Sequence, residues 1–276
     1  MEYEIVATLG PGSDSEAVWT AMLAAGATGF RLNTSHLTLD DLAGWLTRLS
    51  AFLPRRDHPS PSLVLDLQGS KWRLGRFPTA ELVVGHPVEL TLAEAADRPG
   101  LLPVPHGDFF RAAAISGAEL LLNDAKIRLA VESLRGGSLS ARVLQGGPIS
   151  SGKGITYRSS RYRSESLSDK DREIVARTRR LPFVRYALSY VKDAAEMARY
   201  RALIGPAPPL IAKLERQPAL DDAEQIAGLA EALWLCRGDL GAELDFRAMA
   251  EAVHRFSGRA AALPVPVLLA GQVLEH

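Results

Sequence analysis

The alternation of short apolar runs with longer helical segments is the feature that most restricts the fold of this 276-residue chain. Such alternation is typical of βα units, whose strands form a parallel sheet. It predicts seven strands, at residues 4–9, 29–33, 62–68, 183–191, 209–214, 233–236 and 265–270. It predicts helices at residues 13–25, 38–52, 168–179, 194–203, 221–230 and 246–257, the first with a capping box made by Ser13 and Glu16.

Residues 74–163 interrupt the alternation, because they hold Pro, Gly and alternating apolar residues with little helical period. The sequence therefore predicts an α/β fold: a TIM-type (β/α) barrel with an inserted all-β lid domain. The sequence predicts seven strands of this barrel, one fewer than the eight that close a TIM barrel, so we expect an incomplete barrel. We expect the first part of the barrel domain at residues 1–73, a β-barrel lid domain at 74–163, and the second part, truncated before strand eight, at 164–276.

Composition excludes several classes of protein. Lys plus Arg and Asp plus Glu both number 32, so no global field favours nucleic acid or an anionic membrane. One cysteine permits no intramolecular disulfide, and no apolar stretch is long enough to span a membrane, so we expect a cytoplasmic protein. Only 6 of the 32 basic residues are lysines, which makes each lysine a candidate for a role that needs a compact ammonium group.

Charged residues follow the predicted strands, at the end where a parallel α/β barrel has its active site. Glu215 and Asp239 would follow neighbouring strands, and two carboxylates suit a hard divalent ion such as Mg²⁺ or Mn²⁺. A salt bridge that closes the mouth of the barrel is the alternative role for any one of these side chains. Four cations would surround the ion, which fits a phosphorylated or carboxylate substrate: Arg31, Lys71, Arg73 and Lys213.

The chain resembles the pyruvate kinase family in eight segments that occur in the family order. They are IVATLGPGS, GFRLNTSH, LVLDLQGSKWRLG, SGKGI, LSDKDRE, ALSYVKDA, IAKLE and CRGDLGAEL, and NDAKIRL in the insertion resembles the family's DDG segment more weakly. The resemblance implies a glycolytic phosphotransferase that converts phosphoenolpyruvate and ADP to pyruvate and ATP. The inserted domain would close over the nucleotide and the Mg²⁺ or Mn²⁺ ion.

The resemblance also implies roles for individual residues. Lys213 would stabilise the transferring phosphoryl group and the enolate, with Arg31 and Arg73 on phosphate oxygens. Glu215 and Asp239 would hold the metal ion. The substrate-binding set would be Arg237, Gly238, Asp239 and Gly271, and the nucleotide-binding set Asn33, His36 and Lys153.

Many members of the family need K⁺ in a site that corresponds here to Asn33, Ser35, Asp66 and Leu67. Those members typically carry Glu where this chain has Lys71. The sequence is similar to the K⁺-independent branch, in which the lysine ammonium would substitute for the cation. We therefore expect activity without K⁺.

Two departures from the family pattern bear on function. Gly271 stands where the family motif ATQML has a threonine linked to protonation of the enolate, so catalysis would be impaired. No eighth strand with the SGET motif and no C-terminal domain follow, and we expect the open barrel to form a homo-oligomer through its exposed strand edges. Two alternatives therefore stay open: a metal-dependent lyase or aldolase acting on a pyruvate enolate, and a non-catalytic ligand-binding remnant.

Overall fold

The computed structural model describes residues 3–55, 61–69, 71–112, 118–123, 125–157, 167–244 and 246–271. The chain divides into two compact units, each with its own sheet. The barrel unit comprises Met1–Gly69, Ser166–Leu235 and Arg259–Ala270. The lid unit comprises Ser70–Glu165, Cys236–Gly258 and Gly271–His276.

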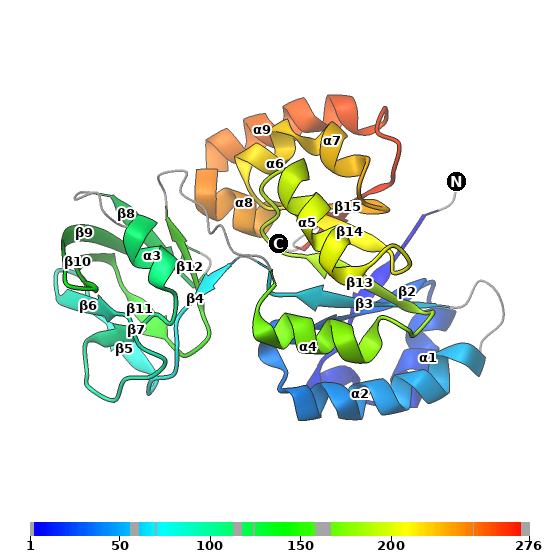
Figure 1. The fold of residues 1–276 in the computed structure, drawn as a ribbon, viewed down its shortest axis with the longest axis horizontal. Helices are drawn as coiled ribbons and strands as arrows, with labels where there is room; N and C mark the ends of the chain where they lie inside the picture. Colours follow the sequence, from blue (N-terminus) through cyan, green and yellow to red (C-terminus); the bar gives the residue numbers. More distant parts are fainter. Residues whose placement is uncertain are drawn as a thin grey trace. The chain divides into compact units, whose positions relative to one another are not determined.

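A seven-stranded sheet curls into a half barrel and forms the centre of the barrel unit (Figure 1). Neighbouring strands from β1 to β15 pair in parallel, as the βα alternation predicts. The predicted α/β barrel fold is confirmed. In sheet order the strands are β1 (Val6–Thr8), β2 (Gly29–Asn33), β3 (Ser62–Leu67), β13 (Val184–Leu188), β14 (Leu210–Leu214), β15 (Ala232–Cys236) and β16 (Val267–Ala270).

Helices follow most of these strands, and their apolar sides are buried. Figure 1 shows α1, α2 and α4 on one side of β3, and α5 beside β14. Trp19 on α1 packs edge-on against Phe52 on α2, with ring centroids 5.2 Å apart, and both side chains are buried. The helices are α1 (Glu16–Ala24), α2 (Leu39–Phe52), α4 (Asp169–Thr178), α5 (Ala194–Ile204), α6 (Gln217–Asp221) and α7 (Ala223–Ala227).

The structure identifies the caps of α1 and α2 and corrects the one cap that the sequence predicted. Thr38 and Asp41 form a reciprocal capping box at the start of α2. The predicted cap at Ser13 is wrong, because Ser13 belongs to the 3₁₀ turn η1 (Pro11–Ser13) and its hydroxyl accepts from the Gly10 amide. Ser15 caps α1 instead, accepting from the Val18 amide.

The lid unit contains a second seven-stranded sheet and a two-stranded one, with an unpredicted short helix, α3 (Gly107–Ala112). Trp72 and Phe109 pack edge-on in its core, 5.4 Å apart, and the Trp72 indole donates to Asp108 at 3.0 Å. The small sheet pairs β11 (Gly147–Ile149) with β5 (Ala80–Leu82). In the large sheet the strands follow the order β4 (Trp72–Arg73), β12 (Gly154–Tyr157), β8 (Glu119–Leu122), β9 (Ile127–Arg135), β10 (Ser138–Gln145), β6 (Pro87–Thr91) and β7 (Leu101–Pro103).

Two helices near the end of the chain lie wholly or mostly in the lid unit. They are α8 (Arg237–Leu244), which contacts β12, and α9 (Phe246–Ala260). Within the described ranges, no helix is both long and apolar enough to cross a membrane.

Candidate active site

Asp66 forms ion pairs with two cationic side chains in the barrel unit. It lies on β3, and the parallel register places it opposite Asn33 of β2 and Ala187 of β13. Arg31 donates to its Oδ2 through Nε at 2.9 Å and through a second, shorter contact, and Lys213 Nζ lies 3.3 Å from Oδ1. Burial raises the pKa of this carboxyl, but the charges of Lys213 and Arg31 outweigh burial and hold the pKa below its ordinary value.

Lys213 and Glu215 extend this cluster from the end of β14. Lys213 is a member of β14, and Glu215 follows its last residue. The Lys213 ammonium lies 2.8 Å from Glu215 Oε1 and donates to Ser189 Oγ at 2.9 Å. Glu215 Oε2 accepts from the Tyr190 amide at 2.7 Å. Both charged side chains are buried, so the cluster is a set of mutually compensated charges rather than solvated surface groups.

Ser189 and Tyr190 are site residues whose roles the sequence did not assign. Ser189 Oγ lies 2.7 Å from the Leu67 carbonyl oxygen and 3.1 Å from Asp66 Oδ1, so it joins the ends of β3, β13 and β14. The only signal in the sequence was their position near the end of the predicted strand at residues 183–191.

The turn after β2 holds three of the predicted nucleotide and cation residues, in η2 (Thr34–His36) and at its cap Asn33. Asn33 Oδ1 accepts from the Ser35 amide at 3.2 Å. Lys170 on α4 donates to the carbonyl oxygens of Thr34 at 2.7 Å and Leu37 at 2.5 Å. Its ammonium thus fastens this turn, a role that the rarity of lysine hinted at without naming the residue.

The loop after β3 is fastened by a second residue of α4. Asp171 accepts from the Gln68 and Gly69 amides, each at 3.2 Å, one on each carboxylate oxygen. Burial raises the pKa of Asp171 above its ordinary value, and the hydrogen bonds from these amides act against that rise. Asp171 therefore holds the loop after β3 by accepting two backbone hydrogen bonds.

The lid unit holds the other predicted residues. Lys71 is buried, and its ammonium lies 2.6 Å from Asp239 Oδ1 on α8. Gly154 makes room for it, since a Cβ there would lie 2.2 Å from Lys71 Cε. Arg73 donates to the Gly152 carbonyl oxygen at 2.9 Å.

The remaining predicted residues also belong to the lid unit. Lys153 precedes β12, Arg237 and Gly238 begin α8, and Gly271 follows β16 with a left-handed φ of +69°.

Glu215 of the barrel unit and Asp239 of the lid unit are the two carboxylates predicted to hold a divalent ion, and carboxylate oxygen is a donor type that Mg²⁺ accepts. Each is a carboxylate with a lysine beside it, Lys213 at Glu215 and Lys71 at Asp239. Among the residues that the structure describes, no group of three or more His, Cys, Asp or Glu side chains could hold a metal. In proteins, Mg²⁺ is commonly held by one or two carboxylates together with substrate oxygens and water.

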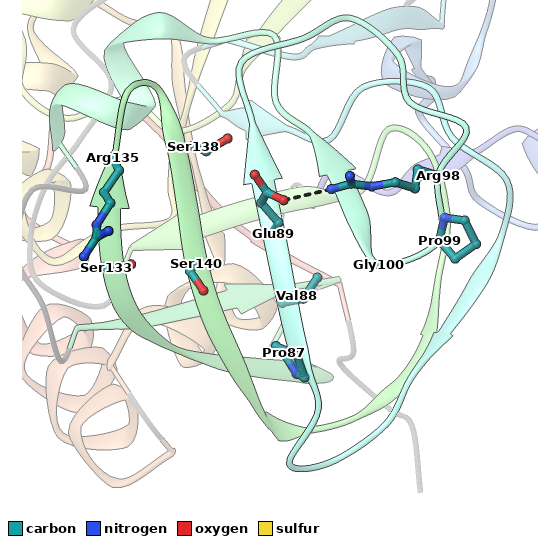
Figure 2. A pocket seen from close by; sticks show the side chains of 10 residues that line it. All are labelled: Pro87, Val88, Glu89, Arg98, Pro99, Gly100, Ser133, Arg135, Ser138 and Ser140. Atoms are coloured by element: carbon teal, nitrogen blue, oxygen red, sulfur yellow. Dashed lines mark hydrogen bonds and ion pairs between the residues drawn. The ribbon is translucent and has the colours of Figure 1, made fainter.

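A separate open pocket of about 620 Å³ lies wholly in the lid unit (Figure 2). Ser138 and Ser140 of β10 line it with Arg135 of β9, and Arg98 pairs with Glu89 of β6 at 3.0 Å. None of the residues predicted for catalysis lines this pocket. The candidate site is therefore defined by the strand-end cluster.

The cluster lies at the C-terminal ends of parallel strands, where (β/α)-barrel enzymes have their active sites. The family model "Pyruvate kinase, barrel domain" matches residues 1–276. Two proteins named pyruvate kinase from Agrobacterium vitis are each 34% identical to the chain, one over 87% of it and the other over 99%. A pyruvate kinase from Mycobacterium intracellulare is 31% identical over 99% of the chain.

The chain belongs to the pyruvate kinase family, and the predicted resemblance is confirmed. It spans about half the length of these curated relatives, covering 51%, 57% and 58% of them.

Proposed function

We propose that this chain transfers the phosphoryl group of phosphoenolpyruvate to ADP, giving pyruvate and ATP. The observation that carries the proposal is the buried Lys213 ammonium at the end of β14, 2.8 Å from Glu215 and 3.3 Å from Asp66. A lysine fixed in this way can stabilise charge that develops on an enolate or a transferring phosphoryl group without moving. The family membership supports this choice of reaction.

The cations of the site would bind and orient the anionic substrate. Arg31 and Arg73 would bind phosphate oxygens through their planar guanidinium groups. Arg31 is held by Asp66 and Arg73 by the Gly152 carbonyl, so neither side chain has to be ordered fully on binding. The backbone at Arg237, Gly238 and Asp239 would receive the substrate carboxylate, and Gly271 is the fourth member of the proposed substrate-binding set.

Asn33, His36 and Lys153 would contact the nucleotide phosphates. Asn33 and His36 belong to the turn that Lys170 fastens. Lys153 lies between the Gly152 turn and β12 of the lid unit.

Glu215 and Asp239 would hold Mg²⁺ or Mn²⁺. When bound, the ion would neutralise charge on substrate oxygens. In the metal-free protein, Lys213 and Lys71 compensate the negative charges of Glu215 and Asp239, because each ammonium lies within 2.8 Å of its partner carboxylate.

We propose that the enzyme does not require K⁺. Asp66 would belong to the monovalent-cation site with Asn33, Ser35 and Leu67, and it already pairs with Lys213 and Arg31. The Lys71 ammonium, which would substitute for the cation, is buried and pairs with Asp239 within the lid unit. Homo-oligomerisation stays a prediction.

The test is pyruvate formation from phosphoenolpyruvate and ADP with Mg²⁺, measured with and without K⁺. Wild type should be active, Lys213→Ala should lose at least 10²-fold in kcat, and Lys213→Arg should not restore it, because the planar guanidinium cannot replace a compact ammonium. Arg247→Ala, at an exposed position on α9, is the control and should match wild type.

Each departure from that result has a definite meaning. Strong stimulation by K⁺ would contradict the K⁺ proposal alone. A folded wild type without phosphoryl transfer would contradict the main proposal and favour enolate lyase chemistry or ligand binding. Loss of activity in Arg247→Ala as well would point to instability rather than to Lys213.

A further inference from the structure

Tyr190 has a backbone conformation that a large side chain rarely adopts. Its φ is +61°, and it is the sole non-glycine residue with positive φ among the described residues of the barrel unit. A bulky residue in the left-handed region is strained, and such strain persists only where the surroundings hold it. The contacts of Tyr190 therefore need an explanation.

The peptide group between Ser189 and Tyr190 is fixed at both of its polar ends. The Ser189 carbonyl oxygen lies against Gly69, where a Cβ would come within 2.1 Å of it. At the other end the Tyr190 amide donates to Glu215 Oε2 at 2.7 Å. The left-handed turn at Tyr190 thus points an N–H group at a buried carboxylate.

The ring of Tyr190 is held by the residue that follows Glu215. The Arg216 guanidinium carbon lies 4.5 Å from the Tyr190 ring centroid, at cation–π distance. Glu215, Arg216 and Tyr190 are all at most 5% exposed. Two successive residues therefore hold Tyr190 at two points, one at its backbone and one at its ring.

We propose that Tyr190 is a positioning residue that sets the orientation of the Glu215 carboxylate. Its amide holds Oε2, which leaves Oε1 directed at Lys213, 2.8 Å away. The ring clamp by Arg216 keeps the strained backbone in place, so that the amide stays aimed at the carboxylate. This inference rests on the proposed role of Glu215 as a metal ligand, because fixed orientation of a ligand raises metal affinity.

The geometry is tested in the metal-free protein by NMR of ¹⁵N-tyrosine-labelled samples. A charge-assisted hydrogen bond should shift the Tyr190 amide proton downfield, and Glu215→Gln should move that proton upfield and speed its exchange with solvent. An amide proton with the same shift and exchange rate in Glu215→Gln would overturn the proposal. This measurement requires neither activity nor a metal ion.

The consequence is tested by Mn²⁺ binding, followed by electron paramagnetic resonance of the free ion. Tyr190→Gly removes the ring that Arg216 contacts and lets residue 190 adopt positive and negative φ about equally. The amide is then no longer fixed, and the Mn²⁺ Kd should rise about tenfold or more. Tyr190→Phe keeps the ring and should bind Mn²⁺ like wild type. Tyr200→Ala removes another buried tyrosine of the barrel unit and should leave the Kd within twofold.

The outcomes separate the two proposals. Equal Kd values in wild type and Tyr190→Gly would overturn the positioning role but would not contradict the metal site. The same conclusion would follow if Tyr200→Ala raised the Mn²⁺ Kd as much as Tyr190→Gly does. A wild type that does not bind Mn²⁺ would overturn the metal site and this inference together. If Tyr190→Gly does not fold, the amide-proton measurement on Glu215→Gln still decides the geometry.

Discussion

Asp66 neutralises two buried or half-buried cations with one carboxylate. Its side chain is 3% exposed, and it contacts Arg31 and Lys213 at once. Transfer of an ammonium group from water into a protein interior is unfavourable unless a partner compensates its charge. Asp66 and Glu215 together therefore compensate the charge of the buried Lys213 ammonium.

Replacement of Asp66 should show a stability loss that depends on pH. Because the pKa of Asp66 is lower in the folded chain than in the unfolded one, its ionisation stabilises the fold above the unfolded pKa of about 3.9. This contribution is lost as the pH falls through the lower, folded-state pKa. Asp66→Asn should cost roughly 3–5 kcal/mol at pH 7, since Lys213 is left buried with one partner fewer.

Urea unfolding of wild type and Asp66→Asn between pH 7 and pH 3 measures this difference. The gap between the two free energies of unfolding should narrow below about pH 4. A gap that stays constant over the whole range would show that packing, not charge, makes Asp66 important.

A second residue-scale prediction concerns Gly69, which has φ of +60° and lies against the Ser189 carbonyl. Gly69→Ala should destabilise by more than the about 1–2 kcal/mol expected for a left-handed alanine, because its Cβ would also collide with that oxygen. Gly136→Ala is the matched control, with φ of +56° and open space around the position. Equal costs in urea unfolding would contradict the collision.

At the scale of elements, the local sequence predicted barrel strands and helices well where a single pattern was clear, either a short apolar run or apolar residues at helical spacing. β2 forms at the predicted residues 29–33, and α2 begins after the Thr38 cap and buries Leu42 and Leu49. Ser13 was assigned the wrong role because a serine followed three residues later by glutamate also occurs in a 3₁₀ turn. Local pattern alone cannot tell which amide the hydroxyl will meet.

The sequence missed α8 because its interior glycines disfavour a helix by about 1 kcal/mol each. Contacts distant in sequence oppose that preference: α8 contacts β12, and its Asp239 pairs with Lys71. The same limit applies to the site. Lys213, Glu215 and Asp66 could be predicted from their strand ends, whereas the backbone conformation of Tyr190 could not.

Helix α2 allows a test of helix propensity, with the opposite substitution at a neighbouring residue as the control. Gly44 lies in the exposed interior of α2, and a Cβ there would meet nothing within 4 Å. Gly44→Ala should therefore stabilise the barrel unit by about 0.5–1 kcal/mol, and Ala43→Gly at the neighbouring exposed position should destabilise it by a similar amount. Thermal and urea unfolding measure both, and a loss of stability in Gly44→Ala would mean that α2 is not helical at this position.

At the scale of the whole molecule, the break in the βα alternation correctly indicated that another sheet interrupts the barrel sequence. The pairing inside that sheet could not be predicted, because β4 and β12 lie more than 80 residues apart and short strands carry little register information. The domain limits proposed at residues 73/74 and 163/164 stay predictions. The pairing of Trp72 with Ile155 favours a first limit just before Trp72.

The lid core is complete without the barrel, which gives the last prediction. All buried apolar residues of that core lie between Trp72 and Tyr157, and β4 pairs with β12, so the two ends of the insertion lie side by side. A fragment of residues 70–165 should therefore fold alone, with a dispersed ¹H–¹⁵N spectrum and one cooperative thermal transition. Leu129→Ala, which removes a fully buried side chain, should cost the fragment about 2–5 kcal/mol and lower its Tm. A fragment with a collapsed spectrum would show that the insertion needs α8 and the rest of the chain to fold, and the Lys71–Asp239 pair would then become a folding contact as well as a site contact.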